Sequence, residues 1–157
     1  MKTPNTTKAE SSATRQGAQI IGPGGLPAKL NTVTAEVLAR LLNYERLTSL
    51  DAVDEASTTR LSAVTFYLAK KYGWPIEAVD KAAGCRDGRV AWVAEYFIAP
   101  EIIARAMAAG VGVWCAKVRA ARRARRTQAA QARRNAERAN SSRSARRSPP
   151  GQQGLFD

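Results

Sequence analysis

The sequence contains no histidine, two cysteines and few aromatic residues. Without histidine the chain lacks the commonest general base and the commonest metal ligand. Cys85 and Cys115 are too few for a disulfide framework or a four-cysteine zinc site. We therefore expect no metal, no cofactor and two reduced thiols.

Long apolar runs are also missing. The first residues, Met1-Lys2-Thr3-Pro4-Asn5, lack the apolar stretch of a secretory signal. No window approaches 18 uninterrupted apolar residues, the length that a membrane-spanning helix needs. These absences favour a cytoplasmic protein without a membrane span.

Catalytic residue sets are scarce. There is no Ser/His/Asp or Cys/His set, and the glycines of segment 22–25 lack the lysine and the following helix of a phosphate-binding loop. The carboxylates Asp51, Asp54 and Glu55 suit helix capping and solvation better than metal binding. The sequence therefore predicts a protein that is not an enzyme.

Positive charge, by contrast, is abundant and unevenly placed. The formal net charge is +12, which favours a polyanionic partner. Residues 31–100 hold eight basic and nine acidic side chains, whereas residues 117–147 hold twelve basic side chains against Glu137. The basic residues of this arginine-rich segment are Lys117, Arg119, Arg122, Arg123, Arg125, Arg126, Arg133, Arg134, Arg138, Arg143, Arg146 and Arg147.

Composition divides the chain into four parts. Residues 1–30 are rich in Thr, Ser, Gly and Pro and are predicted to be a disordered leader. Residues 31–99 form the predicted domain, and residues 100–139 a long C-terminal helix that is arginine-rich from Lys117. Residues 140–157 are predicted to be a disordered tail.

Periodicity within 31–99 predicts mainly helical structure. Helices are expected over 34–42, 50–56 and from about 58 to 71, with Ser49 capping the second and Ser57 or Thr58 the third. A short strand is expected at 47–48, and strands at 76–83 and 90–98 around an Asp87-Gly88 turn. This mainly α, α+β order is that of a winged helix-turn-helix; a three-helix bundle with an appended hairpin and an unrelated α+β domain are the alternatives.

Three short stretches resemble a known family. They are Glu45-Arg46-Leu47-Thr48-Ser49-Leu50-Asp51-Ala52, Thr58-Thr59-Arg60-Leu61-Ser62-Ala63 and Tyr72-Gly73-Trp74-Pro75-Ile76. Over roughly residues 34–98 the chain resembles small helix-turn-helix proteins of bacteriophages, prophages and their proteobacterial hosts. The resemblance implies a winged-helix fold, DNA binding and no enzymatic activity. In such folds the third helix enters the major groove and the hairpin wing touches backbone or minor groove.

Candidate DNA contacts lie on the third helix and on the wing. Arg60 is placed to reach guanine edges or a phosphate, and the start of the helix suits phosphate contact. An ordinary solvated surface is the alternative at both places. The candidates are Thr58, Thr59, Arg60, Tyr67, Lys70 and Lys71 on the helix, and Arg86 and Arg89 on the wing.

The arginine-rich segment predicts salt-sensitive affinity that is blind to sequence, because each neutralised phosphate releases counterions. Its first candidates are Arg119, Arg122, Arg123, Arg125 and Arg126. Past Val118 its apolar residues are all alanine, whereas a membrane-surface helix needs larger apolar side chains opposite its charges. DNA is the expected partner, RNA is an alternative, and a solvated helix without a partner is the plain interpretation.

Two further features concern protein partners. One apolar face of the 101–118 helix (Met107, Val111, Trp114) predicts either a homodimer contact or packing on its own domain. The C-terminal residues Gln152, Leu155 and Phe156 resemble the peptide by which bacterial replication and repair proteins dock on the sliding clamp. Gln153 and Gly154 depart from that pattern.

The sequence thus predicts a DNA-binding helix-turn-helix protein of phage or prophage type, acting in transcription regulation or as a replication accessory. An adaptor that docks on the sliding clamp and an RNA-binding protein are the alternatives.

Overall fold

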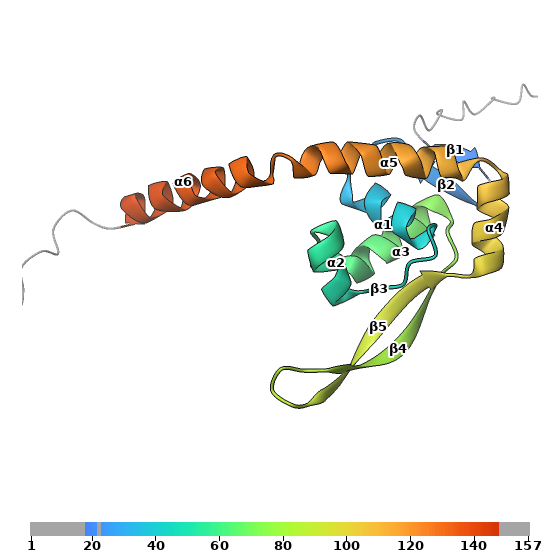
Figure 1. The fold of residues 1–157 in the computed structure, drawn as a ribbon, viewed down its shortest axis with the longest axis horizontal. Coiled ribbons are helices and arrows are strands. Elements are labelled where there is room, and N and C mark those ends of the chain that lie inside the picture. The colour runs from blue at the N-terminus through green and yellow to red at the C-terminus, as the bar shows by residue number, and fades with distance from the viewer. Residues whose placement is uncertain (1–17, 22, 148–157) are drawn as a thin grey trace, which may run out of the picture.

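The structure is a computed structural model that describes residues 18–21 and 23–147. The fold is mixed α+β, and its central elements follow the predicted order of helix, short strand, helix, helix, strand, strand. These are α1 (Val33–Leu41), β3 (Leu47–Thr48), α2 (Ser49–Ala56), α3 (Leu61–Tyr72), β4 (Ile76–Gly84) and β5 (Val90–Ile98). Figure 1 shows α1 to α3 packed together beneath a long C-terminal helical segment.

Helix α1 supplies the centre of the core. Thr32 caps it, because the Thr32 hydroxyl accepts a hydrogen bond from the Ala35 amide at 3.1 Å. Its apolar residues recur at helical spacing and are fully buried, and they are Val37, Leu38, Leu41 and Leu42. The periodicity of the sequence was therefore sufficient to find this helix and its inward face.

Helix α2 begins with a capping box at Thr48, one residue before the predicted cap at Ser49. The Asp51 amide donates to the Thr48 hydroxyl at 3.3 Å, and the Thr48 amide donates to the Asp51 carboxylate at 2.9 Å. The Thr48 amide and the Thr48 hydroxyl, which both donate to the Asp51 carboxylate, lower the pKa of Asp51. Thr48 also belongs to β3, so one residue ends the strand and starts the helix.

Replacing Thr48 with alanine is expected to lower the free energy of unfolding by about 1 kcal/mol at neutral pH. The Asp51 pKa is lower in the folded state than in the unfolded state. The stability that the hydrogen bonds to the Asp51 carboxylate contribute is therefore present above about pH 4. It is lost as the pH falls through the folded-state pKa of Asp51. Urea unfolding of T48A at pH 7 and pH 3 measures both effects. Ser49→Ala is the control, and equal losses for the two variants would contradict the cap.

Helix α3 buries Leu61, Thr65 and Leu68 and ends at Gly73, whose φ of 75° is left-handed. The predicted N-caps of this helix, Ser57 or Thr58, are wrong, because its N-cap is Arg60. Ser57 ends α2 in a left-handed conformation, and the Thr58 hydroxyl accepts a hydrogen bond from the Arg60 amide at 3.1 Å, just before the helix.

The three-stranded sheet has the antiparallel order β3-β5-β4. Only the base of the β4–β5 hairpin meets the core, through Ile98 and the partly buried Ile76 and Tyr96. Its outer part projects as an arm away from the helices (Figure 1). The predicted hairpin is confirmed, and Gly88 takes a positive φ of 83° in its turn.

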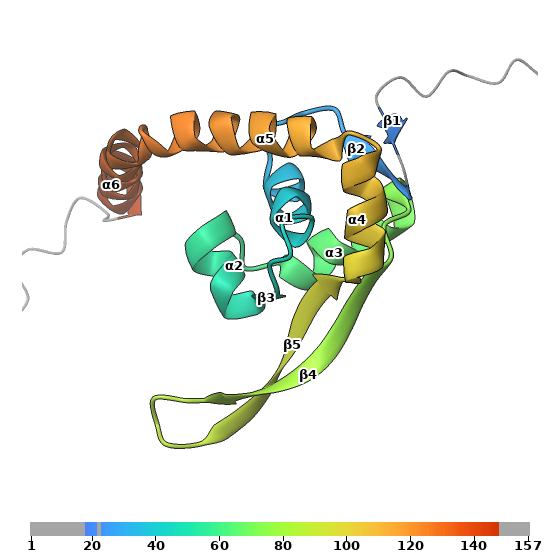
Figure 2. The ribbon, with the colours of Figure 1, turned by 45° about the vertical axis from the view of Figure 1, so that its right-hand side comes forward.

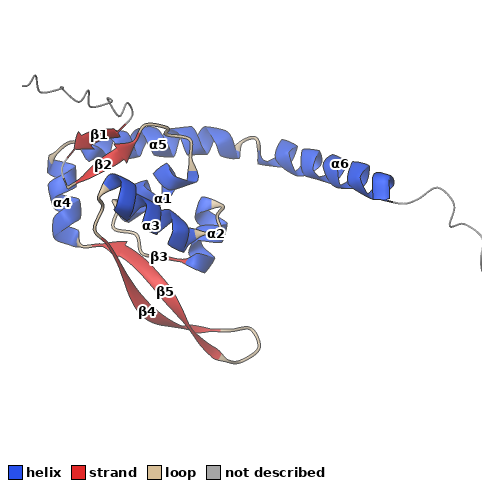
Figure 3. Ribbon diagram, turned by 180° about the vertical axis from the view of Figure 1, so that it is seen from behind, coloured by secondary structure: helices blue, strands red, loops and turns tan. Residues whose placement is uncertain are grey.

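The expected disordered leader is wrong for residues 18–27. Here β1 (Ala18–Ile21) and β2 (Gly24–Pro27) form an antiparallel hairpin, drawn in red near α5 in Figure 3. Trp74 holds this hairpin on the core, because its indole N–H donates to the Gly25 carbonyl at 2.6 Å. A Cβ at Gly24 would lie 2.7 Å from the Trp74 ring, so only glycine fits there.

The expectation of a single helix over 100–139 is wrong, because three helices form this part of the chain. They are α4 (Pro100–Ala108), α5 (Val111–Arg126) and α6 (Ala129–Arg147), and Figure 2 shows the turn between α4 and α5. The first break is at Gly110, whose φ is 92°. Helix α6 also runs past 139, so the expected disordered tail is helical to Arg147.

The apolar face predicted over 101–118 packs on its own domain. Ile103, Val111 and Val118 are buried in the core, and the Trp114 indole donates to the Pro27 carbonyl at 3.2 Å. The packed unit therefore extends beyond the expected boundary at residue 99. No helix among the described residues is long and apolar enough to cross a membrane.

Candidate nucleic-acid interface

The exposed face of α3 combines cations with aromatic rings. Phe66 and Tyr67 keep 63% and 42% of their surface exposed, and Lys70 and Lys71 lie one turn further on. The Lys71 ammonium donates to the Tyr67 hydroxyl at 2.5 Å, and the Lys70 ammonium lies 5.9 Å from the centre of the Phe66 ring. The hydrogen bond to Tyr67 raises the pKa of Lys71 above its usual range.

The residues before α3 are less available than the sequence predicts. The Thr58 amide donates to the Ala52 carbonyl at 3.0 Å, so it is used by the end of α2 and is not free for a phosphate. Thr59 and Arg60 are exposed. Of the predicted contacts at this end of the helix, these two remain accessible.

The tip of the arm carries Arg86 and Arg89. The Arg89 guanidinium lies 2.7 Å from the Asp87 carboxylate, which lowers the pKa of Asp87 and offsets the Arg89 charge. Arg86 is exposed and has no ion pair within the described residues. Further along the arm Trp92 exposes 71% of its surface. Arg86 is therefore the stronger cation of this loop.

Most acidic side chains of the domain are bound in internal ion pairs. Glu95, on the arm, lies 2.6 Å from the Lys81 ammonium and 3.2 Å from the Arg46 guanidinium, and both cations lower its pKa. The Arg46 guanidinium also lies 4.2 Å from the centre of the Phe97 ring. These ion pairs of Arg46 and Lys81 are not predictable from the sequence, since Glu95 lies 49 and 14 residues away from them.

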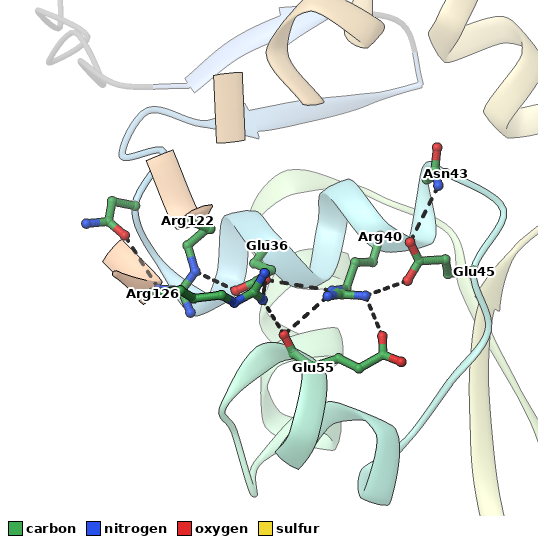
Figure 4. Close-up of polar contacts among 8 residues, drawn as sticks. Glu36, Arg40, Asn43, Glu45, Glu55, Arg122 and Arg126 are labelled. Carbon is green, nitrogen blue, oxygen red and sulfur yellow. Dashed lines mark hydrogen bonds and ion pairs between the residues drawn. The ribbon is translucent and has the colours of Figure 1, made fainter. Parts of the chain in front are cut away.

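A second network joins α1, α2 and α5 around Glu36, which is 5% exposed (Figure 4). Its carboxylate pairs with Arg122 and Arg126 of α5 and lies 3.8 Å from Arg40. Arg40 also pairs with Glu55 and, at 2.8 Å, with Glu45. The Arg126 guanidinium donates to the Glu55 carbonyl at 2.5 Å, where α2 ends.

This network divides the predicted arginine candidates. Arg122 and Arg126 bind Glu36 and hold α5 against α1, whereas Arg123 and Arg125 are exposed. The Arg119 guanidinium is 3.4 Å from the Asn43 side-chain oxygen. A cleft of about 180 Å³ lies between α1 and α5, and five of its ten lining residues are arginines.

Comparison with protein-family models, curated proteins and solved structures finds no match.

The remaining predicted sites lie elsewhere. Gln152, Leu155 and Phe156 are outside the described residues. Among residues 18–21 and 23–147 no group of three potential ligands could hold a metal ion. Burial of Cys115 raises the pKa of its thiol to about 11, so this cysteine is an unreactive core residue at neutral pH.

The sequence analysis also missed Phe66. The helical spacing from Tyr67 and Lys70 puts it on the same exposed face, and an exposed aromatic residue beside a lysine was the available signal. The structure thus brings Arg60, Phe66, Tyr67, Lys70 and Lys71 onto one helix surface and places Arg86 on a separate arm.

Proposed function

We propose that this protein binds DNA through a winged helix-turn-helix domain, with α3 as the groove-reading helix and the β4–β5 arm as the wing. The arginine-rich segment adds affinity that does not depend on sequence. A role of phage or prophage type, in transcription regulation or as a replication accessory, follows the family resemblance given above.

The α3 surface is the observation that carries this proposal. Arg60 at the N-cap of α3 and Lys70 and Lys71 in its last turn are exposed, and the helix contains no acidic residue. These three cations and the Tyr67 hydroxyl can donate hydrogen bonds to phosphates and to base edges. A polyanion therefore meets only favourable charges on this helix.

The order of elements supports the same assignment. Helices α2 and α3 are joined by a short turn, and the arm follows α3 directly. The three-stranded order β3-β5-β4 ties the arm to the strand before α2. This connectivity fits a helix-turn-helix unit with one wing.

The acidic residues of α2 differ in how far their charge is offset. Asp51 is engaged in the capping box with Thr48, and Glu55 pairs with Arg40. Asp54 has no ion pair or hydrogen bond within the described part of the chain. Of the three carboxylates of α2, only Glu55 is offset by an ion pair, and the hydrogen bonds of Asp51 hold it beside Thr48 without removing its charge.

The proposal predicts that the double variant K70A/K71A binds a mixed-sequence DNA duplex at least tenfold more weakly at low salt. Its salt dependence should fall by about two units of slope, because two phosphate contacts are lost. Fluorescence anisotropy at several salt concentrations measures both quantities. K29A removes an exposed lysine outside α3 and is the control. Equal affinities for K70A/K71A and K29A would show that α3 is not the DNA-binding helix.

A further inference from the structure

Helix α6 stands apart from the rest of the fold. It extends beyond the packed helices (Figure 1), and its described side chains, up to residue 144, are all exposed. Arginines at 133, 134, 138 and 143 lie on several sides of the helix, and Glu137 is its one acidic residue. An isolated helix of this length gains little stability from propensity alone. Its like charges would be relieved by a polyanion.

One face of α6 combines an asparagine, an alanine, a serine and an arginine. Asn135, Ala139, Ser142 and Arg143 lie at positions i, i+4, i+7 and i+8, which share one side of an α-helix. Glu137 lies on the opposite side. The Gln131 amide donates to the Asn135 side-chain oxygen at 2.9 Å, which leaves the second lone pair of this oxygen and the Asn135 N–H groups for a base.

We propose that α6 lies in the major groove of duplex DNA with this face turned toward the base edges. The inference rests on the proposed DNA binding and adds a second groove-reading element to it. Asparagine pairs with adenine, arginine with guanine and serine with either, while alanine allows close approach to a thymine methyl group. The four side chains therefore supply base-reading chemistry and not only charge.

The dimensions of the helix fit this groove. An α-helix is about 10–12 Å across with its side chains, and the major groove of B-form DNA is about 12 Å wide. The 19 residues of α6 span about 28 Å, most of one turn of the duplex. Arg133, Arg134 and Arg138 flank the reading face and would meet the phosphates beside the groove. The deep, narrow groove of A-form RNA does not admit side chains to its base edges.

The base of α6 is held by the domain. Arg122 and Arg126, one turn apart at the end of α5, bind Glu36 of α1. The next helix starts at Ala129, just beyond this contact. The network of Figure 4 thus fixes the point from which α6 leaves the domain.

The matched variants N135A/R143A and R133A/N140A test this proposal. Each removes one asparagine and one arginine, the first variant from the reading face and the second from positions beside it, and neither touches the core. Selection of bound sequences from a randomised duplex pool, followed by salt titration on the selected site, is the measurement, with full-length protein throughout.

N135A/R143A should lose sequence preference at two or more base pairs and bind the selected site at least fivefold more weakly per lost contact. R133A/N140A should keep the preference and lose only about one unit of salt slope. Equal effects of the two variants, or tighter binding of a structured RNA than of the duplex, would overturn the proposal while nucleic-acid binding stands. Absence of wild-type binding at low salt would reject the proposed function itself.

Discussion

Replacing Glu36 with alanine is expected to lower the free energy of unfolding by about 3 kcal/mol. Glu36 is buried, and its carboxylate is the common partner of Arg40, Arg122 and Arg126. Loss of this carboxylate leaves three neighbouring cations without their shared counter-charge. Arg122, whose side chain is 12% exposed, cannot be rehydrated without moving α5.

Urea unfolding followed by circular dichroism measures this loss. E77A removes an exposed carboxylate on β4 that has no ion pair within the described residues, and it should change stability by less than about 0.5 kcal/mol. E36Q keeps the size of the side chain, so its loss of unfolding free energy should lie between those of E36A and E77A. Similar stabilities for E36A and E77A would show that the Glu36 network does not hold α5 in place.

Replacing Trp74 with alanine is expected to cost about 4 kcal/mol. Its ring is 1% exposed, packs against Gly24 and donates its indole N–H to the Gly25 carbonyl. The variant would lose the core packing of the ring and the anchor of the β1–β2 hairpin together. The expected cost is therefore at the upper end for a core residue.

Trp92→Ala is the matched control, since the same side chain is 71% exposed there. W92A should change the free energy of unfolding by less than about 0.5 kcal/mol. Chemical unfolding of both variants under identical conditions gives the comparison. Equal costs would mean that Trp74 does not anchor the hairpin.

The sequence predicted the central elements because their signals are local. The apolar spacing of Val37, Leu38 and Leu41 identifies α1, and Asp87-Gly88 identifies the turn of the arm. The β1–β2 hairpin was missed because its glycines and prolines are typical of loops. Its stability depends on Trp74, which is 49 residues away.

The candidate site was predictable in part for the same reason. Arg60, Tyr67, Lys70 and Lys71 share one helix surface, and their spacing alone reveals it. The roles of Arg122 and Arg126 were not predictable, because their partner Glu36 is 86 and 90 residues away. The charge of the segment suggests that these arginines are available to DNA. In the folded protein they bind Glu36 instead.

The salt dependence of duplex DNA binding by the full-length protein tests the central claim most directly. Titrations from low to physiological salt should give a plot of log affinity against log salt with a slope of about −5 or steeper, because α3 and the exposed arginines of α5 and α6 each displace counterions. Absence of binding at the lowest salt, or an affinity that does not change with salt, would contradict the account.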